Sequence, residues 1–451
     1  MRIIVIGCGT IGRNIVRHMR KEKHNIIVID SNKDVVENLI ERNDVLGVVG
    51  NGASIDILTE AGAKLADFVI AVTASDEINI LACAVAKKLG ATNTIARVRK
   101  PEYLNQNTIF KEEFGINMII NPELEAANEI TNMLRLPGVI KIEQFGKNKA
   151  NLIELLVEQK SFMAGETLIS LAQKIRTKFI VCAVQRSGTV TIPSGNFLVR
   201  RGDHLHIIVE ADKTEEFLKE LNLLKDPIKK IIIIGGSMIA YYVCENLAKK
   251  NLNIFVIESK MERAKELAAS LPNANIIYGD GTDHELLKEV GIDSCDASIA
   301  LTNIDEENLL VSMYATQIDV RKVITKLKRD SFVSLFDDLG VASIVSPKDL
   351  VSFKIISYIR AFANQEGSNL VSMFRFANNK AEALEFQAKK KERFYNRPLK
   401  ELKFKDNSLV ACIVREGKVI LPKGDDVIMA DDHIIVVTLH EDFDDLTDII
   451  K

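Results

Sequence analysis

The chain carries an internal repeat, and this repeat constrains its fold more than any other feature. Gly7 and Gly235 are 228 positions apart, and so are Asp30 and Glu258. The stretch VTASDEIN matches LTNIDEEN at an offset of 229, and IVCAVQRSGTVTIPSG matches LVACIVREGKVILPKG at the same offset. Because nearly the same offset holds from end to end, the sequence predicts four units in the order A-B-A′-B′.

Each A unit predicts an α/β fold with a Rossmann-like, doubly wound parallel sheet. The run IIVIG is rich in β-branched residues, Gly12–Lys21 has a helical pattern, and NIIVID forms a second strand. Short apolar strands that alternate with helices are typical of a parallel sheet buried on both faces. A long helix is expected after Pro122, with a counterpart in PKDLVSFKIISYIRAF.

Each B unit is shorter and predicts a small α+β module. A hairpin signal at Arg186–Gly188, and again at Arg415–Gly417, lies between two β-type runs. The charged, proline-containing link Lys225–Lys230 separates the halves. The expected domains are 1–137, 138–224, 228–363 and 368–451.

Composition narrows the class of protein. The chain has 451 residues, of which 47% are hydrophobic and 27% charged, and its formal net charge is −3. These values fit a soluble globular protein and give no basic excess for nucleic acid. The six cysteines form no CxxC pair, which argues against a zinc site or a disulfide framework. With no secretory signal pattern, scattered thiols favour the cytosol.

The clearest chemical motif is a glycine-rich turn after the first strand. Gly7, Gly9 and Gly12 form a GxGxxG pattern between a strand and a helix. These glycines permit a tight turn, the approach of a pyrophosphate and close helix packing, and the helix N-terminus favours an anion. Asp30 ends the second strand, where its carboxylate suits ribose hydroxyls and repels a 2′-phosphate. The motif therefore predicts NAD(H) rather than NADP(H).

The second copy of this turn departs from the first at two positions. Ser237 and Ala240 replace glycines, and the side chain of Ser237 narrows the approach of a pyrophosphate. Gly235, Glu258 and Asp280 are kept as candidate binding residues. Two interpretations remain open, because this site either takes a smaller adenine nucleotide, ATP or ADP, or takes none.

No catalytic residue and no metal ligand is predicted. Neither B unit supplies the acid–base group that a dehydrogenase needs. The acidic clusters Asp76–Glu77 and Asp305–Glu307 are interpreted as helix N-terminal acids rather than as catalytic pairs. His204 and His206, two positions apart, are interpreted as a solvated strand face, since two ligands fall short of a metal shell.

The stretch from IIVIGCGTIG through GNGA to ATNTIARVRKPEY resembles the RCK (KTN) nucleotide-binding domain. The order RCK_N, RCK_C, RCK_N, RCK_C resembles the TrkA family, the peripheral regulatory subunits of Trk potassium-uptake systems, over nearly the whole chain. The resemblance implies NAD(H) binding at Gly7, Cys8, Gly9, Thr10, Ile11, Asp30, Asn51, Thr73, Ala74 and Arg97.

The resemblance also implies an assembly and a role. It implies a homo-oligomeric ring, a dimer or tetramer of tandem subunits, that docks under a TrkH-type channel on the cytoplasmic side of the plasma membrane. Nucleotides would change the shape of the ring and gate potassium flow without catalysis. The residues alone leave two alternatives, an NAD-dependent oxidoreductase with degenerate B units and a free-standing nucleotide sensor.

Overall fold

The computed structural model describes residues 1–451 except 23, 105, 159–160, 225, 330, 334–342, 364–368, 378, 390–393, 441–442 and 444. It contains two compact units, the first made of residues 1–126 and 346–363 and the second of residues 127–345 and 364–451. The start of the expected link, at Lys225, and the expected boundary between 363 and 368 lie outside the described residues.

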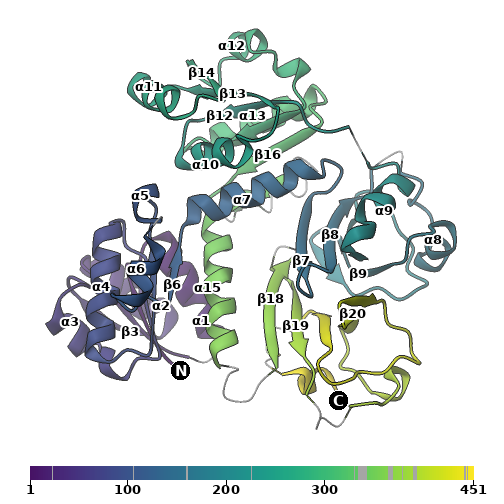
Figure 1. Ribbon diagram of the computed structural model, residues 1–451, viewed down its shortest axis with the longest axis horizontal. Coiled ribbons are helices and arrows are strands. Elements are labelled where there is room, and N and C mark those ends of the chain that lie inside the picture. Colours follow the sequence, from purple (N-terminus) through teal and green to yellow (C-terminus); the bar gives the residue numbers. More distant parts are fainter. Residues whose placement is uncertain are drawn as a thin grey trace. The chain divides into compact units, whose positions relative to one another are not determined.

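The first unit is built on a six-stranded parallel sheet with helices on its faces (Figure 1). Its strand order is β3-β2-β1-β4-β5-β6, so the order reverses between β1 and β4, and ligands of doubly wound sheets bind at such a point. The elements of this repeat are β1 Arg2–Ile6, α1 Thr10–Lys21, β2 Asn25–Asp30, α2 Lys33–Asn43, β3 Leu46–Val49, α3 Ile55–Glu60, β4 Phe68–Ala71, α4 Asp76–Leu89, β5 Asn93–Arg97, α5 Pro101–Leu104, α6 Asn107–Glu112, β6 Met118–Ile120 and α7 Pro122–Arg135. Helix α7 begins in the first unit and continues into the second after Ala126.

The second unit contains a sheet of the same kind, which confirms the predicted duplication of the Rossmann-like fold. Its order, β14-β13-β12-β15-β16-β17, reverses at the same point. The elements of this half are β12 Lys230–Ile234, α10 Met238–Leu247, β13 Asn253–Glu258, α11 Met261–Ser270, β14 Ala274–Tyr278, α12 His284–Glu289, β15 Ala297–Ala300, α13 Asp305–Gln317, β16 Lys322–Lys326, β17 Ser343–Val345 and α15 Pro347–Ala363.

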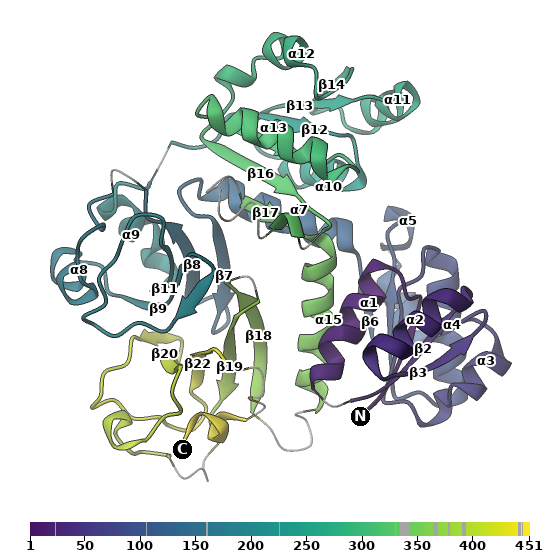
Figure 2. The same ribbon diagram turned by 180° about the vertical axis from the view of Figure 1, so that it is seen from behind.

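Helix α15 belongs to the first unit, although its sequence follows the second sheet. It packs along α1 (Figure 2), where Asn14 Nδ2 donates to Asp349 Oδ1 at 2.8 Å and to Ser352 Oγ at 3.1 Å. In the second unit, the continuation of α7 contacts α10, since Asn246 Nδ2 donates to Asn128 Oδ1 at 3.0 Å. The first helix of each Rossmann-like fold therefore contacts the long helix of the other repeat, which the sequence did not predict.

The two B units form five-stranded antiparallel sheets in the second unit, as expected for small α+β modules. Their hairpins turn at Ser187–Gly188 and Glu416–Gly417, all with positive φ, as predicted. The elements are β7 Lys141–Phe145, β8 Ala150–Leu156, α8 Leu168–Lys174, β9 Phe179–Arg186, β10 Thr189–Thr191, β11 His204–Glu210 and α9 Thr214–Glu220, then β18 Leu370–Phe376, β19 Ala381–Gln387, β20 Ser408–Arg415, β21 Lys418–Ile420 and β22 His433–Thr438.

The interpretation of His204 and His206 as a solvated pair is wrong. Strand β11 lies in the middle of its sheet. One face of this sheet shares a buried apolar cluster with the other antiparallel sheet. His206 is 1% exposed, and its ring centroid lies 4.7 Å from that of Phe376. His204 Nδ1 lies 2.8 Å from Glu154 Oε1. The sequence shows alternation along a strand but not what covers each face.

Candidate functional site

The first glycine-rich turn lies at the carboxyl end of β1, in the crevice where the strand order reverses. Gly7 has a φ of +91°, and a Cβ added there would lie 2.7 Å from the backbone nitrogen of Thr73. A Cβ added at Gly12 would lie 2.0 Å from the carbonyl oxygen of Gly7. Only glycine therefore fits at these two positions, which let α1 and β4 pack directly against the turn.

Gly9 has a different role, because its φ of −71° suits any residue. Gly9 is the N-cap of α1, no side chain caps this helix, and its first turn contains no acidic residue. A Cβ added at Gly9 would meet no atom within 4 Å. The open space lies beside uncapped N–H groups at Thr10 and Ile11, so this arrangement fits a pyrophosphate.

Asp30 is fixed beside the turn by main-chain hydrogen bonds. Its Oδ2 accepts from the N–H of Cys8 at 2.7 Å, and its Oδ1 accepts from the N–H of Asn32 at 2.9 Å. The N–H of Gly50 donates to the carbonyl of Asp30 at 2.9 Å, which brings the loop of Asn51 to the same edge. The carboxylate retains lone pairs for ribose hydroxyls.

Cys8 contributes its backbone to this arrangement rather than a reactive thiol. Burial, with the nearby charge of Asp30 as a second cause, raises the pKa of the Cys8 thiol to about 12. All six cysteines are free and buried. Within the described residues, no group of three or more His, Cys, Asp or Glu side chains is placed to share a metal ion. The site is thus suited to binding through backbone groups.

The ends of β4 and β5 are joined by Asn79, which sequence reasoning missed. Its Oδ1 accepts from the N–H of Thr73 at 2.8 Å, and its Nδ2 donates to the carbonyl of Arg97 at 2.9 Å. Asn308 makes the equivalent contacts in the second half. The signal was present in the repeat, because the asparagine ends both VTASDEIN and LTNIDEEN.

Asp76 does more than the predicted helix N-terminal acid. It is 2% exposed, and its Oδ2 accepts from the N–H groups of Arg99 and Lys100, each at 2.9 Å. Asp305 accepts from the two equivalent N–H groups at 3.0 Å. Both carboxylates therefore fix the loop after the fifth strand of their sheet. Arg99 also donates to the carbonyl of Ala74.

The second turn differs at its helix N-terminus. Ser237 is the N-cap of α10, and its Oγ accepts from the N–H of Ala240 at 3.5 Å. Glu258 is placed like Asp30, because its two carboxylate oxygens accept from the N–H groups of Gly236 and Lys260 at 2.8 Å. The second turn keeps the ribose-type acid, but a serine side chain takes the position that is open in the first turn.

The other predicted residues of the second half lie at matching positions. Gly235 has a φ of +95°, and a Cβ there would lie 2.8 Å from the backbone nitrogen of Thr302. Asp280 Oδ1 accepts from the N–H of Thr282 at 2.9 Å and from its Oγ at 2.8 Å. Both halves thus keep the frame of a nucleotide crevice.

A guanidinium group lies on each turn, although the repeat does not align the two arginines. Arg13 Nε, from α1, donates to the carbonyl of Cys8 at 2.9 Å. Arg263 Nε, from α11, donates to the carbonyl of Gly236 at the same distance. Because the arginines come from different helices, comparison of the repeats could not find them. Each adds a positive charge near its turn, which favours an anionic ligand.

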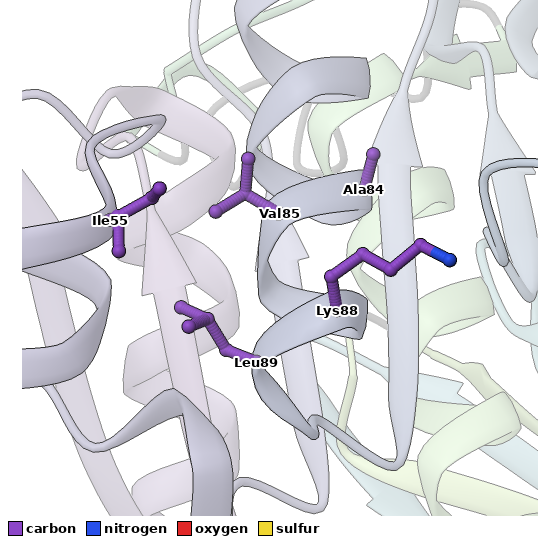
Figure 3. Close-up of a pocket in the computed structure, with 5 residues that line it drawn as sticks. All are labelled: Ile55, Ala84, Val85, Lys88 and Leu89. Atoms are coloured by element: carbon purple, nitrogen blue, oxygen red, sulfur yellow. The ribbon is translucent and has the colours of Figure 1, made fainter.

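A cavity of about 270 Å³ lies in the first unit beside α3 and the C-terminal part of α4 (Figure 3). The side chains of Ile55, Val85 and Leu89 point toward one another there, and Ala84 and Lys88 complete the lining. None of the predicted binding residues lines this cavity. Its lining is mostly hydrocarbon and holds no backbone turn, so it does not suit a phosphate.

Comparison with known proteins gives consistent matches along the chain. The TrkA-N domain matches residues 3–122 and 231–347, and the TrkA-C domain matches residues 152–222 and 384–451. The Trk system potassium uptake protein TrkA homolog 1 of Methanosarcina mazei is 30% identical over 447 residues, which is 97% of each chain. The protein named Trk system potassium uptake protein TrkA in Vibrio alginolyticus is 29% identical over 449 residues, 98% of this chain and 97% of its own.

Solved structures share the fold at lower identity. The GsuK RCK domain superposes with a TM-score of 0.63 at 17% identity, over 97% of this chain and 92% of its own. The GsuK channel bound to NAD gives a TM-score of 0.61 at 17% identity, over 97% of this chain and 76% of its own. At these identities the likeness establishes the tandem Rossmann-like fold.

Proposed function

Since the chain belongs to the family of Trk system potassium uptake proteins named TrkA, we propose that it is the nucleotide-binding regulatory subunit of a Trk-type potassium-uptake system. Its role is to gate potassium flow rather than to catalyse a reaction. A ligand shifts a conformational equilibrium only through different affinities for the two states. A nucleotide at the crevice of a Rossmann-like sheet provides such a difference without a catalytic base.

The proposed ligand of the first half is NAD(H). One observation carries this assignment: the N-terminus of α1 is uncapped and open at Gly9, whereas Ser237 caps the matching helix. When bound, the dinucleotide supplies negative phosphates and ribose hydroxyls, which the turn and Asp30 are arranged to receive. The proposed binding residues are Gly7, Cys8, Gly9, Thr10, Ile11, Gly12, Asp30, Asn51, Thr73, Ala74 and Arg97.

The second half is proposed to hold ATP or ADP, or no nucleotide. Glu258 keeps the acid that suits a ribose, and Arg263 places a positive charge at the turn. The Ser237 cap competes with a phosphate for the N–H groups of α10. Gly235 and Asp280 complete the proposed second site. A site with fewer phosphate contacts favours the smaller ligand.

The proposed assembly is a homo-oligomeric ring that docks against a TrkH-type membrane subunit on the cytoplasmic face of the plasma membrane. Support comes from the Trk names of the relatives and from the fold shared with the GsuK channel. No helix in the described part of the chain is long and apolar enough to cross a membrane. We assign the domains to residues 1–137, 138–224, 228–363 and 368–451.

Potassium uptake by cells that lack the gene tests this function. Deletion is expected to reduce rubidium or potassium uptake at low external potassium, and the intact gene is expected to restore it. The Asp30→Ala variant is expected to be produced in these cells, but potassium uptake is expected not to respond to NADH. Unchanged uptake in the deletion strain would favour a free-standing sensor instead.

The oxidoreductase alternative has a separate test. The purified chain is incubated with NADH and a broad panel of carbonyl acceptors while the nicotinamide absorbance is recorded. Constant absorbance is expected, because no described side chain at the first turn is placed as an acid–base pair. Steady turnover that Asp30→Ala abolishes would instead establish an enzyme.

A further inference from the structure

A half-buried pair of opposite charges lies just behind the first turn, within the first unit. Thr73 packs against Gly7, since a Cβ on Gly7 would come within 2.7 Å of its nitrogen. The carbonyl oxygen of Thr73 lies 3.5 Å from Nη1 of Arg97. On the far side, Nη2 of Arg97 lies 3.9 Å from Oε1 of Glu123, the second residue of α7. Arg97 therefore lies between the turn and the start of α7.

Neither charge of this pair is fully satisfied. The two side chains are 15% and 21% exposed, yet 3.9 Å is longer than a hydrogen bond. Nε of Arg97 and Oε2 of Glu123 are buried and have no hydrogen-bond partner among the described residues. Buried charged atoms without partners cost free energy, so they call for an explanation. Burial lowers the pKa of the Arg97 guanidinium, and Glu123 is the main opposing charge.

The neighbouring charged side chains, Asp76 and Arg99, make their hydrogen bonds elsewhere. Asp76 Oδ2 accepts two main-chain N–H groups, and Arg99 donates to the carbonyl of Ala74. Asp76 Oδ1 lies 3.6 Å from Nε of Arg99. Within the described part of the chain, Asp76 Oδ1 also lacks a hydrogen-bond partner and adds a weaker attraction to Arg97. Glu123 is the carboxylate that pairs with Arg97, at a distance longer than a hydrogen bond.

The second half has lysines at the two matching positions. Lys326 occupies the position of Arg97, and its Nζ donates to the carbonyl of Leu301 at 3.0 Å. Lys348 occupies the position of Glu123, since Pro347 matches Pro122 at the start of the long helix. Two lysines cannot form an ion pair. The arginine–glutamate pair thus belongs to the half whose helix N-terminus is open to a phosphate.

We infer that Glu123 is a further residue of the first nucleotide site. It is a positioning residue, whose carboxylate holds the Arg97 guanidinium until a nucleotide phosphate takes the place of that carboxylate. The inference rests on the proposed binding of NAD(H) at the first turn. A phosphate offers the planar guanidinium better hydrogen bonds than a carboxylate at 3.9 Å. When the phosphate displaces the Glu123 carboxylate, a negative charge is freed in the first turn of α7. This helix continues into the second unit. This gives the ligand a contact that differs between two states, as allosteric coupling requires.

The test is NADH titration of the full chain and its variants by fluorescence, with EDTA present so that no divalent cation bridges the carboxylate. Glu123→Gln removes the competitor and is expected to raise NADH affinity about fivefold. Arg97→Gln is expected to weaken binding. In the Arg97→Gln background, Glu123→Gln is expected to have no effect. Thermal melting confirms that each variant is folded.

Glu125→Gln is the matched control, because it removes the same charge two residues away. Glu125 Oε1 lies 2.5 Å from Lys354 Nζ rather than near Arg97. It is expected to leave NADH affinity within twofold of the parent. Equal effects of the two substitutions, or a loss of affinity in Glu123→Gln, would overturn the inference while leaving the proposed function intact. A parent chain that binds no nucleotide would overturn both.

Discussion

Replacing Gly9 by serine separates the function of the first turn from its stability. A side chain at Gly9 meets no atom within 4 Å, and the backbone there, with a φ of −71°, is close to that of Ser237, with a φ of −68°. The new hydroxyl is expected to cap α1 as Ser237 caps α10. The first turn would then have the helix N-terminus of the second turn.

The two expected effects of Gly9→Ser have different sizes and opposite directions. Serine stabilises a helix N-terminus by only a few tenths of a kcal/mol relative to glycine. A phosphate that loses hydrogen bonds to the helix N-terminus loses about 1.5–3 kcal/mol, since these are bonds to a charged group. This corresponds to a loss of affinity on the order of 10-fold to 100-fold. Stability is therefore expected to hold while NADH binding falls.

The assay combines thermal melting with NADH fluorescence titration of the full chain. Gly9→Ala adds the Cβ without the hydroxyl, and is expected to weaken binding less than Gly9→Ser. An unchanged melting temperature with NADH affinity within twofold of the parent would refute the assignment of the pyrophosphate to this turn. A large fall in melting temperature would refute the claim that the space outside Gly9 is free.

Four further substitutions test other parts of the structure. Gly12→Ala is expected to lower the free energy of unfolding by about 2 kcal/mol and to abolish NADH binding, because its Cβ meets a backbone oxygen. Ala240→Gly is expected to lower the free energy of unfolding, measured by thermal melting, by about 1 kcal/mol. Asp76→Ala is expected to lower the melting temperature by the equivalent of about 2 kcal/mol, since two N–H groups lose their acceptor. Burial lowers the pKa of His206 to about 4 from its ordinary value of 6.5, so stability is intact above pH 6.5 and falls by up to about 3 kcal/mol as the pH drops toward 4. His206→Ile, which copies Ile435 of the second half, is expected to flatten this dependence of melting temperature on pH; an unchanged slope would contradict it.

The sequence predicted the Rossmann-like sheets and the small antiparallel modules because their signals are local. Strand runs, the glycine turn and the hairpins at Gly188 and Gly417 depend on neighbouring residues. The exchange of the long helices was not predictable in this way. The contact of Asn14 with Asp349 joins residues 335 positions apart, and no local pattern encodes which copy of a helix pairs with which sheet. For the same reason the halves are not expected to fold separately when the chain is cut at the link.

In the candidate site, too, local motifs could be predicted from the sequence and long-range contacts could not. The glycines and Asp30 were predicted from a short motif, and they lie together at one edge of the sheet. Asn79 was visible in the repeat, but its role became clear only from its contacts with two strands. The capping difference between Gly9 and Ser237 follows from backbone geometry that sequence can only suggest.

The stoichiometry of NADH binding to the full chain, measured by calorimetry, tests the central claim most directly. We expect one NADH site per chain, which Asp30→Ala weakens and Glu258→Ala leaves unchanged. These two acids have the same main-chain contacts in their respective halves, so each variant controls for the other. Two equivalent NADH sites per chain, or loss of binding in Glu258→Ala alone, would contradict the account.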